Sequence, residues 1–476
     1  MHRFTRVPAL YSLVVAVCAL VLTGCGAPAD VGGSDVDAGG AGARAAVSRE
    51  AAAPVAVAAE TVPPGSPGED YRMLTPDGAW SWLADPRAVW YEGEYRRTYA
   101  AWVNSIGDIR VASYDHDTNE RTTVTLRPEF HADDHANPTL LVRPDGRIMV
   151  FYAMHRGRWL ITQTSTNPED ITLWGEEKDA GPFTSEARGH TGPRPVLLPG
   201  EENRVMLFWR GPGYDTWLRT SANGWDWDMP EPFMAAGESS PYFHVAGDGD
   251  ASIHIAVSPV HPRVEGGDRI LYARYHDDAV WRADGTRIRG MYELPFTMDE
   301  CDVVYDGTTD GASAWVWDVA DDEGIPVIVY ATFPSLDDHR YWYARWTPRG
   351  WERHEIAAAG PWFPSGNIGT RQHDRYYAGG ITLDHENPSI VYLSRQVGGI
   401  FEIERWETGD GGATWESEPV TAGSRANNVR PVVPRISAVS IGTTEPPSTL
   451  FWMNGSYVDY GEYSTSIRMQ TTGTSP

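Results

Sequence analysis

Three side chains that can move protons or bind anions stand at the ends of apolar runs. His135 lies in the polar segment 133–138 (DDHANP), and His155 ends the apolar run that follows. The separation, 155 − 135 = 20 residues, allows for a strand and its return, which could bring both rings to one face of a sheet assembly. Arg210 follows the apolar run 205–209, and a guanidinium can clamp a carboxylate with two hydrogen bonds.

Each of these residues also has an ordinary structural interpretation. His135 could be a turn residue bonded to Asp133 or Asp134, and His155 could be one of the many histidines found at strand ends. Arg210 could form a surface or inter-sheet salt bridge.

A dense polar and aromatic motif lies earlier in the chain. It contains Trp80, Trp82, Asp85 and Arg87. Sugar rings stack on tryptophan and arginine binds anions, so Trp82 and Arg87 are candidate substrate contacts. Since Asp85 and Arg87 flank Pro86, they could instead pair with each other and fix a loop.

The composition excludes several classes of protein. The 476 residues include 39 Lys+Arg against 65 Asp+Glu, and the net charge of −26 argues against a general nucleic-acid binder, because phosphate neutralisation needs surplus Lys and Arg. A charged fraction of 22% and a mean hydropathy of −0.40 exclude a polytopic membrane protein. The 48 Gly, 35 Pro, 20 Trp and 22 Tyr favour turn-rich β architecture over a helical bundle.

The N-terminus has the features of a bacterial lipoprotein signal, since a basic start and an apolar run end in LTGC at 22–25. We expect cleavage before Cys25, lipid attachment to its thiol and a location on the extracellular face of the bacterial cell membrane. An ordinary secretory signal would give a secreted protein instead. Residues 1–24 are thus the predicted signal, and residues 25–69, rich in Ala, Gly and Pro, are a predicted disordered tether. Apart from Cys25, the mature chain would keep only Cys301, so no intrachain disulfide is expected.

Residues 70–476 read as one repetitive β domain. Short runs of Val, Ile, Tyr, Trp and Phe alternate with Gly, Asp, Asn and Pro, and the pattern returns at roughly 50–60 residues, as in propeller blades. This predicts an all-β, seven-bladed β-propeller, with six or eight blades as alternatives. The segment 408–415 (TGDGGATW) fits the Asp-box pattern, with a degenerate copy at 220–227. The Asp-box is a structural turn and indicates a propeller rather than an activity.

The chain resembles the BNR-repeat propellers of the group that includes the ulvan lyases of polysaccharide lyase families 24 and 25. The likeness covers nearly all of the chain from Thr75 to Gln470. The matching segments are WSWLADPRA at 80–88, DDHANP at 133–138, YAMH at 152–155, FWRG at 208–211, SPY at 240–242, HPR at 261–263, YAGGITLDHENP at 377–388, YLSR at 392–395 and NVRP at 428–431.

The resemblance implies two active-site histidines, which we assign to His135 and His155, and a catalytic-face arginine, which we assign to Arg210. The family's lyases also place a catalytic tyrosine on the strand before this arginine, where the present chain has GHTGPRP at 189–195. Tyr242 is the best alternative source of a catalytic phenol, although it could also be an aromatic that packs between blades.

Three further residues are candidate substrate contacts on the same resemblance. Asn137 could add a contact to a carboxylate, His190 could serve as a base, and His261 precedes the Pro-Arg of the HPR segment. For His261, packing in a structural role is the slightly favoured alternative.

The resemblance implies a lyase that removes the proton at C5 of a uronate and expels the substituent at O4 of an ulvan-type polymer. The expected partner is an acidic polysaccharide; we expect no nucleic acid, contact with the membrane through the lipid anchor only, and a monomer. No cofactor is required for this chemistry, and a structural metal ion with unassigned ligands is a further expectation. The alternatives are a non-catalytic glycan-binding lipoprotein and a sialidase-like glycoside hydrolase, which needs paired carboxylates or a Tyr–Glu pair with an arginine triad. Since the net charge is −26, a lyase predicts a local basic surface around the candidate residues.

Overall fold

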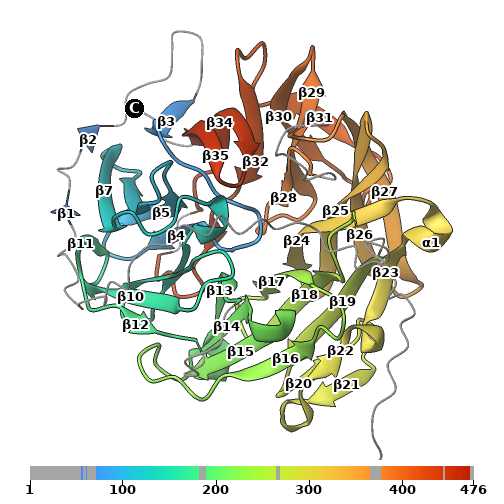
Figure 1. Cartoon of the computed structure of the whole chain (residues 1–476), viewed down its shortest axis with the longest axis horizontal. Coiled ribbons are helices and arrows are strands. Elements are labelled where there is room, and N and C mark those ends of the chain that lie inside the picture. Colours follow the sequence, from blue (N-terminus) through green and yellow to red (C-terminus); the bar gives the residue numbers. More distant parts are fainter. Residues whose placement is uncertain are drawn as a thin grey trace, which may run out of the picture. The chain divides into compact units, whose positions relative to one another are not determined.

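The computed structural model describes residues 55–56, 60–61, 71–181, 189–263, 269–364, 377–442 and 445–471. Within these ranges the chain forms seven sheets arranged around one axis as the blades of a propeller (Figure 1). The predicted all-β, seven-bladed fold is therefore confirmed. The predicted signal, with Cys25, lies outside the described residues, as does the predicted tether apart from two short strands. None of the described helices has the length and apolar character needed to span a membrane.

The first four blades follow one another along the chain. Blade 1 contains β4 (Ala88–Glu92), β5 (Arg96–Val103), β6 (Ile109–Asp115) and β7 (Glu120–Arg127), with β1 (Val55–Ala56), β2 (Glu60–Thr61) and β33 (Arg435–Ile436) at its edges. Blade 2 contains β8 (Thr139–Val142), β9 (Ile148–Ala153), β10 (Leu160–Asn167), β11 (Asp170–Trp174) and β12 (Lys178–Asp179). Blade 3 contains β13 (Thr191–Leu198), β14 (Arg204–Arg210), β15 (Thr216–Ser221), β16 (Glu231–Ala235) and β22 (Phe296–Thr297). Blade 4 contains β17 (Tyr242–Gly247), β18 (Ser252–Ser258), β19 (Arg269–His276), β20 (Ala279–Trp281), β21 (Arg287–Gly290) and β23 (Asp302–Asp306).

The last three blades have four strands each. Blade 5 contains β24 (Ser313–Asp322), β25 (Ile325–Ser335), β26 (Asp338–Thr347) and β27 (Gly350–Gly360). Blade 6 contains β28 (Ile381–Leu383), β29 (Ile390–Val397), β30 (Ile400–Glu407) and β31 (Glu416–Pro419). Blade 7 contains β32 (Asn427–Val432), β34 (Thr449–Asp459), β35 (Glu462–Thr471) and β3 (Arg72–Thr75). The described helices are α1 (Gly307–Asp310) and the 3-10 turns η1 (Asp134–Ala136), η2 (Pro199–Glu201), η3 (Pro212–Tyr214), η4 (Met291–Glu293) and η5 (Met298–Glu300).

Among the described residues, the core consists of seven buried apolar clusters, one at each interface between neighbouring blades. Strand β9 shows why its sequence is apolar throughout. Ile148, Val150 and Tyr152 face blade 1, whereas Met149 and Phe151 face blade 3. Successive side chains of a strand point to opposite faces, and here both faces are buried, so the strand reads as a continuous apolar run.

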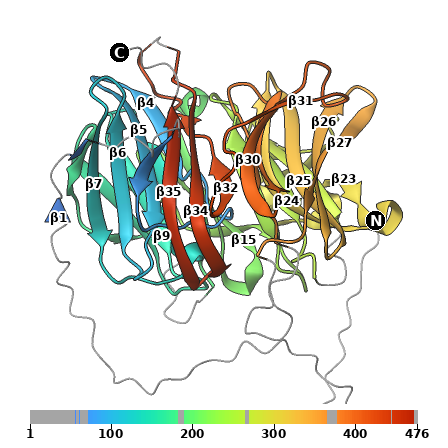
Figure 2. The same ribbon diagram turned by 90° about the horizontal axis from the view of Figure 1, so that it is seen from above.

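The ring is closed by a strand from the start of the propeller. Strand β3 pairs with β35, with Arg72 opposite Met469 and Thr75 opposite Ile467. A strand that precedes blade 1 in the sequence therefore completes blade 7. Figure 2 shows β34 and β35 standing next to β4–β7 of blade 1, where Leu74 and other residues of both blades form one cluster. A blade built from both ends of the propeller ties the first and last blades together.

The segment 79–87, between β3 and β4, crosses the axis. Trp82 stacks on Trp317 of blade 5, with ring centroids 4.6 Å apart, and Asp85 contacts His244 of blade 4 at 3.2 Å. This crossing segment therefore fills the middle of the ring and contacts blades on its far side.

One end of the propeller collects the candidate residues, and we call it the entry face. The innermost strands β4, β8, β13, β17, β24, β28 and β32 begin there, and the antiparallel second strands end there. His135 precedes β8 and Tyr242 starts β17, whereas His155 follows β9 and Arg210 ends β14. The topology alone therefore brings these four residues to one end of the molecule.

Candidate functional site

The loop before β8 is organised around the carboxylate of Asp133. Asp133 is the N-cap of η1, and its side chain accepts a hydrogen bond from the backbone N–H of His135 at 2.8 Å. The same Oδ1 lies 2.8 Å from Nδ1 of His135. One short polar turn thus fixes both the backbone and the ring of His135.

His155 reaches the same carboxylate from the β9–β10 turn. Its Nδ1 lies 3.0 Å from Oδ2 of Asp133, and its ring stacks on that of His135 with centroids 4.0 Å apart and planes 6° apart. Tyr460 packs edge-on against both rings, at 5.4 and 5.5 Å. Because Asp133 engages Nδ1 of each histidine, Nε2 is the nitrogen that each ring can offer to a bound molecule.

The two stacked rings differ in charge. Burial disfavours the cationic form of His135, but the carboxylates of Asp133 and Asp134 outweigh it and raise the pKa of His135 to about 10. For His155, burial and the neighbouring positive charge of His135 lower the pKa to about 4, against the opposing effect of Asp133. At neutral pH the pair therefore holds one imidazolium and one neutral imidazole, a division typical of acid–base sites.

Arg210 and Tyr242 lie beside this pair. Arg210 is 7% exposed at the end of β14, and its positive charge contributes to the lowered pKa of His155. The guanidinium carbon of Arg210 lies 5.1 Å from the centroid of the Tyr242 ring, over its face. We call His135, His155, Arg210 and Tyr242 the His135–His155 site.

His261 and His190 occupy different surroundings. The ring of His261 lies 6.2 Å from Tyr242 and 4.4 Å from Trp315, and burial together with Arg263 lowers its pKa to about 3. It therefore adjoins the site as a neutral group. His190 is fully buried, its Nδ1 accepts a hydrogen bond from the indole of Trp209 at 2.9 Å, and burial lowers its pKa to about 4. His190 thus lies in the interior and does not join the group.

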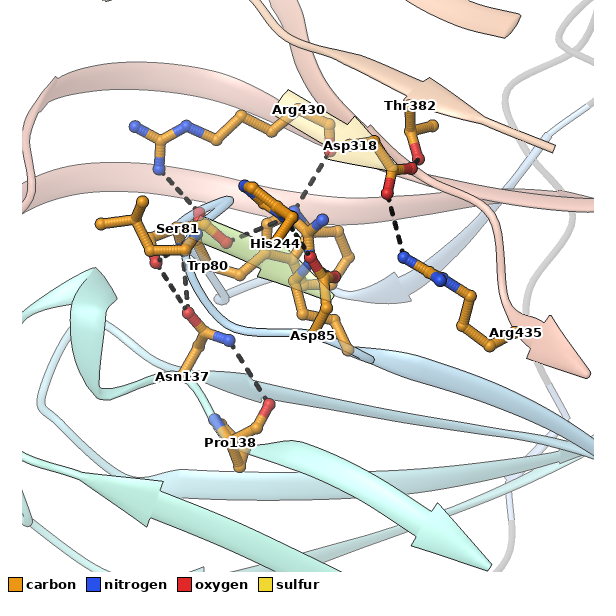
Figure 3. Close-up of polar contacts among 12 residues, drawn as sticks. Trp80, Ser81, Asp85, Asn137, Pro138, His244, Asp318, Thr382, Arg430 and Arg435 are labelled. Atoms are coloured by element: carbon orange, nitrogen blue, oxygen red, sulfur yellow. Dashed lines mark hydrogen bonds and ion pairs between the residues drawn. The ribbon is translucent and has the colours of Figure 1, made fainter. Parts of the chain in front are cut away.

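The structure places Asn137, Arg87 and Trp82 in the support of the crossing segment. The side-chain oxygen of Asn137 accepts hydrogen bonds from the backbone N–H and the hydroxyl of Ser81, both at 3.1 Å (Figure 3). Arg87 donates to Asp85 at 3.0 Å, the alternative that the sequence left open. Trp82 is 2% exposed, in its stack with Trp317.

Two parts of the site could not be identified from the sequence: the bridging role of Asp133, and the contacts of Asp134 behind it. The sequence indicates Asp133 only as a possible turn partner of His135, because its bond to His155 joins residues 22 positions apart. Behind it, Asp134 forms a buried ion pair with Arg430 of blade 7 and accepts from the hydroxyl of Tyr457 at 2.6 Å. Such contacts between the first and last parts of the ring arise only when the propeller closes.

A second set of charged residues lies near the axis, which we call the axial cluster: Asp85, His244, Asp318, His385 and Arg435 (Figure 3 labels all but His385). Asp85 lies 3.2 Å from Nδ1 of His244, and Asp318 lies 3.1 Å from Nε2 of His385. Arg435 pairs with Asp318 at 3.0 Å and donates to Nδ1 of His385 at 2.8 Å. Asp85, His385 and Arg435 help to line a cavity of about 390 Å³.

Asp133, His135 and His155 could be considered as metal ligands, because their donor atoms lie within 4.8 Å of one another. The parallel rings argue against this, since an ion shared between them would lie outside both ring planes, whereas imidazole donates its lone pair within the plane. Zn–N distances of about 2.0–2.1 Å would require one ring to turn. The geometry therefore fits a hydrogen-bonded pair better than a metal centre.

Comparison with known proteins agrees with this fold. A family model described as BNR repeat-containing family member matches residues 97–359, more than half of the chain. No curated protein matches the sequence.

Solved structures with the same fold include polysaccharide lyases. A PL25 ulvan lyase bound to -[GlcA(1-4)Rha3S]- has a TM-score of 0.61 and 15% identity, over 83% of this chain and 94% of its own. A further structure of a PL25 ulvan lyase has a TM-score of 0.60 and 16% identity, over 84% and 94%. The polysaccharide lyase Uly1 has a TM-score of 0.52 and 13% identity, over 85% and 98%. The predicted resemblance to BNR-repeat propellers and ulvan lyases is confirmed; at these identities it establishes a shared fold.

Proposed function

The chain belongs to the BNR repeat-containing family, and we propose that it is a polysaccharide lyase that cleaves a uronate-containing, ulvan-type polymer by β-elimination at the His135–His155 site. The observation that carries the proposal is the stacked histidine pair on one carboxylate, one ring charged and one neutral, with Arg210 and Tyr242 beside it.

The residues of the site match the needs of the reaction. The proton at C5 is barely acidic while the adjacent carboxylate is charged, so the site must neutralise that carboxylate, accept the proton and protonate the leaving oxygen. Cationic His135 and Arg210 would bind the carboxylate. Neutral His155, with the proton on Nδ1 directed at Asp133, offers its Nε2 lone pair to the C5 proton.

The electrons then balance without a cofactor. As the C5–H bond breaks, the C4=C5 double bond forms and the C4–O bond breaks. The hydroxyl of Tyr242 would give its proton to the departing oxygen and regain one from His155 or from water. The likeness in fold to ulvan lyases, one of them bound to -[GlcA(1-4)Rha3S]-, supports an ulvan-type substrate.

The glycoside hydrolase alternative requires a carboxylic acid that stays protonated. Although both are buried, Asp133 and Asp134 have lowered pKa values, because His135 lies beside Asp133 and Arg430 beside Asp134. These carboxylates are therefore poor general acids. One observation favours the glycan-binding alternative. The ulvan lyases have a catalytic tyrosine on the strand before the arginine, whereas the corresponding strand here, β13, begins with Thr191 and contains no tyrosine.

The proposed setting is the outer surface of a bacterial cell. We propose that Cys25 is lipidated and holds a monomeric propeller outside the membrane. Metabolic labelling with a fatty-acid analogue tests this, since the natural chain should carry the label and a Cys25→Ala variant should not.

The test of function follows ultraviolet absorbance, because elimination leaves a double bond conjugated to the uronate carboxylate. Incubation with a panel of uronate polymers should raise the absorbance with at least one. Tight oligosaccharide binding without turnover would identify a glycan-binding protein instead. New reducing ends without the absorbing product would identify a hydrolase.

A further inference from the structure

Two turns next to the His135–His155 site present cationic and aromatic side chains to solvent. The β9–β10 turn carries Arg156, Arg158 and Trp159, and the β14–β15 turn carries Tyr214. Trp159 is 50% exposed and Tyr214 is 36% exposed. We call these four residues the arginine–aromatic ledge.

The ledge continues directly from the site. The guanidinium carbon of Arg210 lies 5.8 Å from the centroid of the Tyr214 ring, and that of Arg156 lies 5.4 Å from the same ring. Arg158 lies over Trp159 at 4.8 Å. Tyr214 thus links Arg210 of the site to the cationic turn of the neighbouring blade.

Backbone contacts hold the β9–β10 turn against blade 3. The N–H of Gly157 donates to the carbonyl of His190 at 3.0 Å, and that of Arg156 donates to the hydroxyl of Thr191 at 2.8 Å. Arg156 and Tyr214 have φ values of 53° and 64°, which are uncommon for residues other than glycine. Strained residues persist where their surroundings impose them, and they concentrate at ligand sites.

The charge of Arg158 is open to an anion. Arg158 has no carboxylate partner within the part of the chain that the structure describes. Asp215, the acid next to Tyr214, accepts a hydrogen bond from the backbone N–H of Ala236 at 2.7 Å. In a chain with a net charge of −26, an exposed arginine on an indole beside the site is a local positive surface.

We propose that the arginine–aromatic ledge is a second anion-binding subsite, which takes a sulfate on the sugar next to the uronate that undergoes elimination or a carboxylate one sugar further along. This inference rests on the proposed function. Guanidinium groups bind both anions in a bidentate fashion, and the apolar face of a sugar ring packs on an exposed indole or phenol. The ledge then favours polymers that carry charge on successive sugars.

The test measures binding by calorimetry on a Tyr242→Phe background, in which turnover should be about 10²-fold slower. The probes are the -[GlcA(1-4)Rha3S]- oligosaccharide and its desulfated counterpart. Arg158→Gln should weaken binding of the sulfated probe about fivefold to tenfold, as loss of a charge-assisted contact requires. Trp159→Ala should weaken both probes by about fivefold, because stacking does not depend on the charge. Arg349→Gln, 85% exposed on the β26–β27 turn, is the matched control and should change neither.

The outcomes separate the subsite from the proposed function. If Arg158→Gln weakens only the sulfated probe, the ledge binds sulfate; if it weakens both probes equally, the ledge binds the uronate carboxylate. A second outcome would overturn the ledge proposal alone. In it, the natural chain cleaves the polymer, but the Arg158→Gln and Trp159→Ala variants bind both probes as tightly as the Arg349→Gln control. If the parent chain neither binds nor cleaves any uronate polymer, both proposals fall together.

Discussion

Two regions of the propeller contain buried pairs of histidine and aspartate, but the pairs differ in charge and in role. The His135–His155 site has two histidines on the shared carboxylate of Asp133, with Asp134 behind. The axial cluster has one histidine on each of Asp85 and Asp318. In both regions the carboxylates are buried and accept hydrogen bonds from imidazole.

The regions differ in where the guanidinium groups lie. Asp85 pairs with Arg87, and Asp318 pairs with Arg435, whereas Asp133 has no arginine partner within the described ranges. Burial accordingly lowers the pKa of His244 and of His385, which stay neutral, while Asp133 and Asp134 overcome burial and raise that of His135. In the axial cluster both carboxylates are paired with arginine and burial prevails. At the site Asp134 is paired with Arg430, but Asp133 is not paired with an arginine within the described ranges, and its charge favours the imidazolium of His135. The axial cluster therefore contributes to the stability of the propeller, whereas the site contains a protonated histidine, His135, that can take part in acid–base chemistry.

The largest expected effect comes from Asp133→Asn. Asparagine can still cap η1, but buried His135 loses its main charge partner. The free energy of unfolding should therefore fall by about 3 kcal/mol, and the charge that holds both rings is lost. The kcat for uronate elimination should fall about 10⁴-fold, by analogy with loss of the orienting carboxylate in a catalytic triad. Steady-state kinetics and thermal unfolding measure the two quantities. An unchanged kcat would show that the shared carboxylate does not matter.

Tyr242→Phe should have the next largest effect. It removes the proposed proton donor while keeping the ring beside Arg210, so kcat should fall about 10²-fold with KM nearly unchanged. The matched control in the axial cluster is Thr382→Val, which removes a hydroxyl that donates to Asp318 at 2.9 Å. If both variants lose activity equally, the contrast between the regions is wrong.

Asp318→Asn should damage the fold rather than the chemistry. It leaves Arg435 without its buried partner, which should lower the free energy of unfolding by about 3 kcal/mol. Below the unfolding temperature kcat should be preserved. Denaturant unfolding followed alongside kinetics checks this, and a large loss of kcat in folded protein would assign the axial cluster a part in the reaction.

The pH dependence should give the smallest but most specific effect. Activity needs neutral His155 and cationic His135, so it should fall as pH drops towards about 4 and as pH rises through about 10. The pKa of His135 is raised above its ordinary value of 6.5, so its contribution to stability is complete below about 6.5 and is lost as pH rises through about 10. In Asp133→Asn the alkaline limb of kcat/KM should move towards 6.5. If the alkaline limb does not move, deprotonation of His135 is not the cause of the fall in kcat/KM at high pH.

The propeller fold and the proximity of His135 and His155 could be predicted from the sequence. Apolar runs at regular spacing specify blades, and 20 residues between His135 and His155 suffice for one strand and its return, here β8 and β9. Tyr242 and Arg210 follow because inner strands start, and second strands end, at the same face.

Other features depend on contacts that no local pattern encodes. Nothing in the segment 79–87 indicates that it crosses the axis, and that crossing engages Arg87, Trp82 and Asn137 in structural bonds. His190 resembles a polar site residue in sequence, but strand pairing places the indole of Trp209 against its Nδ1. The role of Asp133 required knowledge of the position of His155.

The most direct test is an NMR titration of the ring nitrogens in protein labelled with ¹⁵N-histidine, with single substitutions used for assignment. At pH 7 we expect His135 to show an imidazolium, His155 to be neutral with its proton on Nδ1, and His244 and His385 to be neutral. Four neutral rings, or a neutral His135 beside a charged His244, would contradict the claim that the arginine-free carboxylate of Asp133 sets the charge of the site.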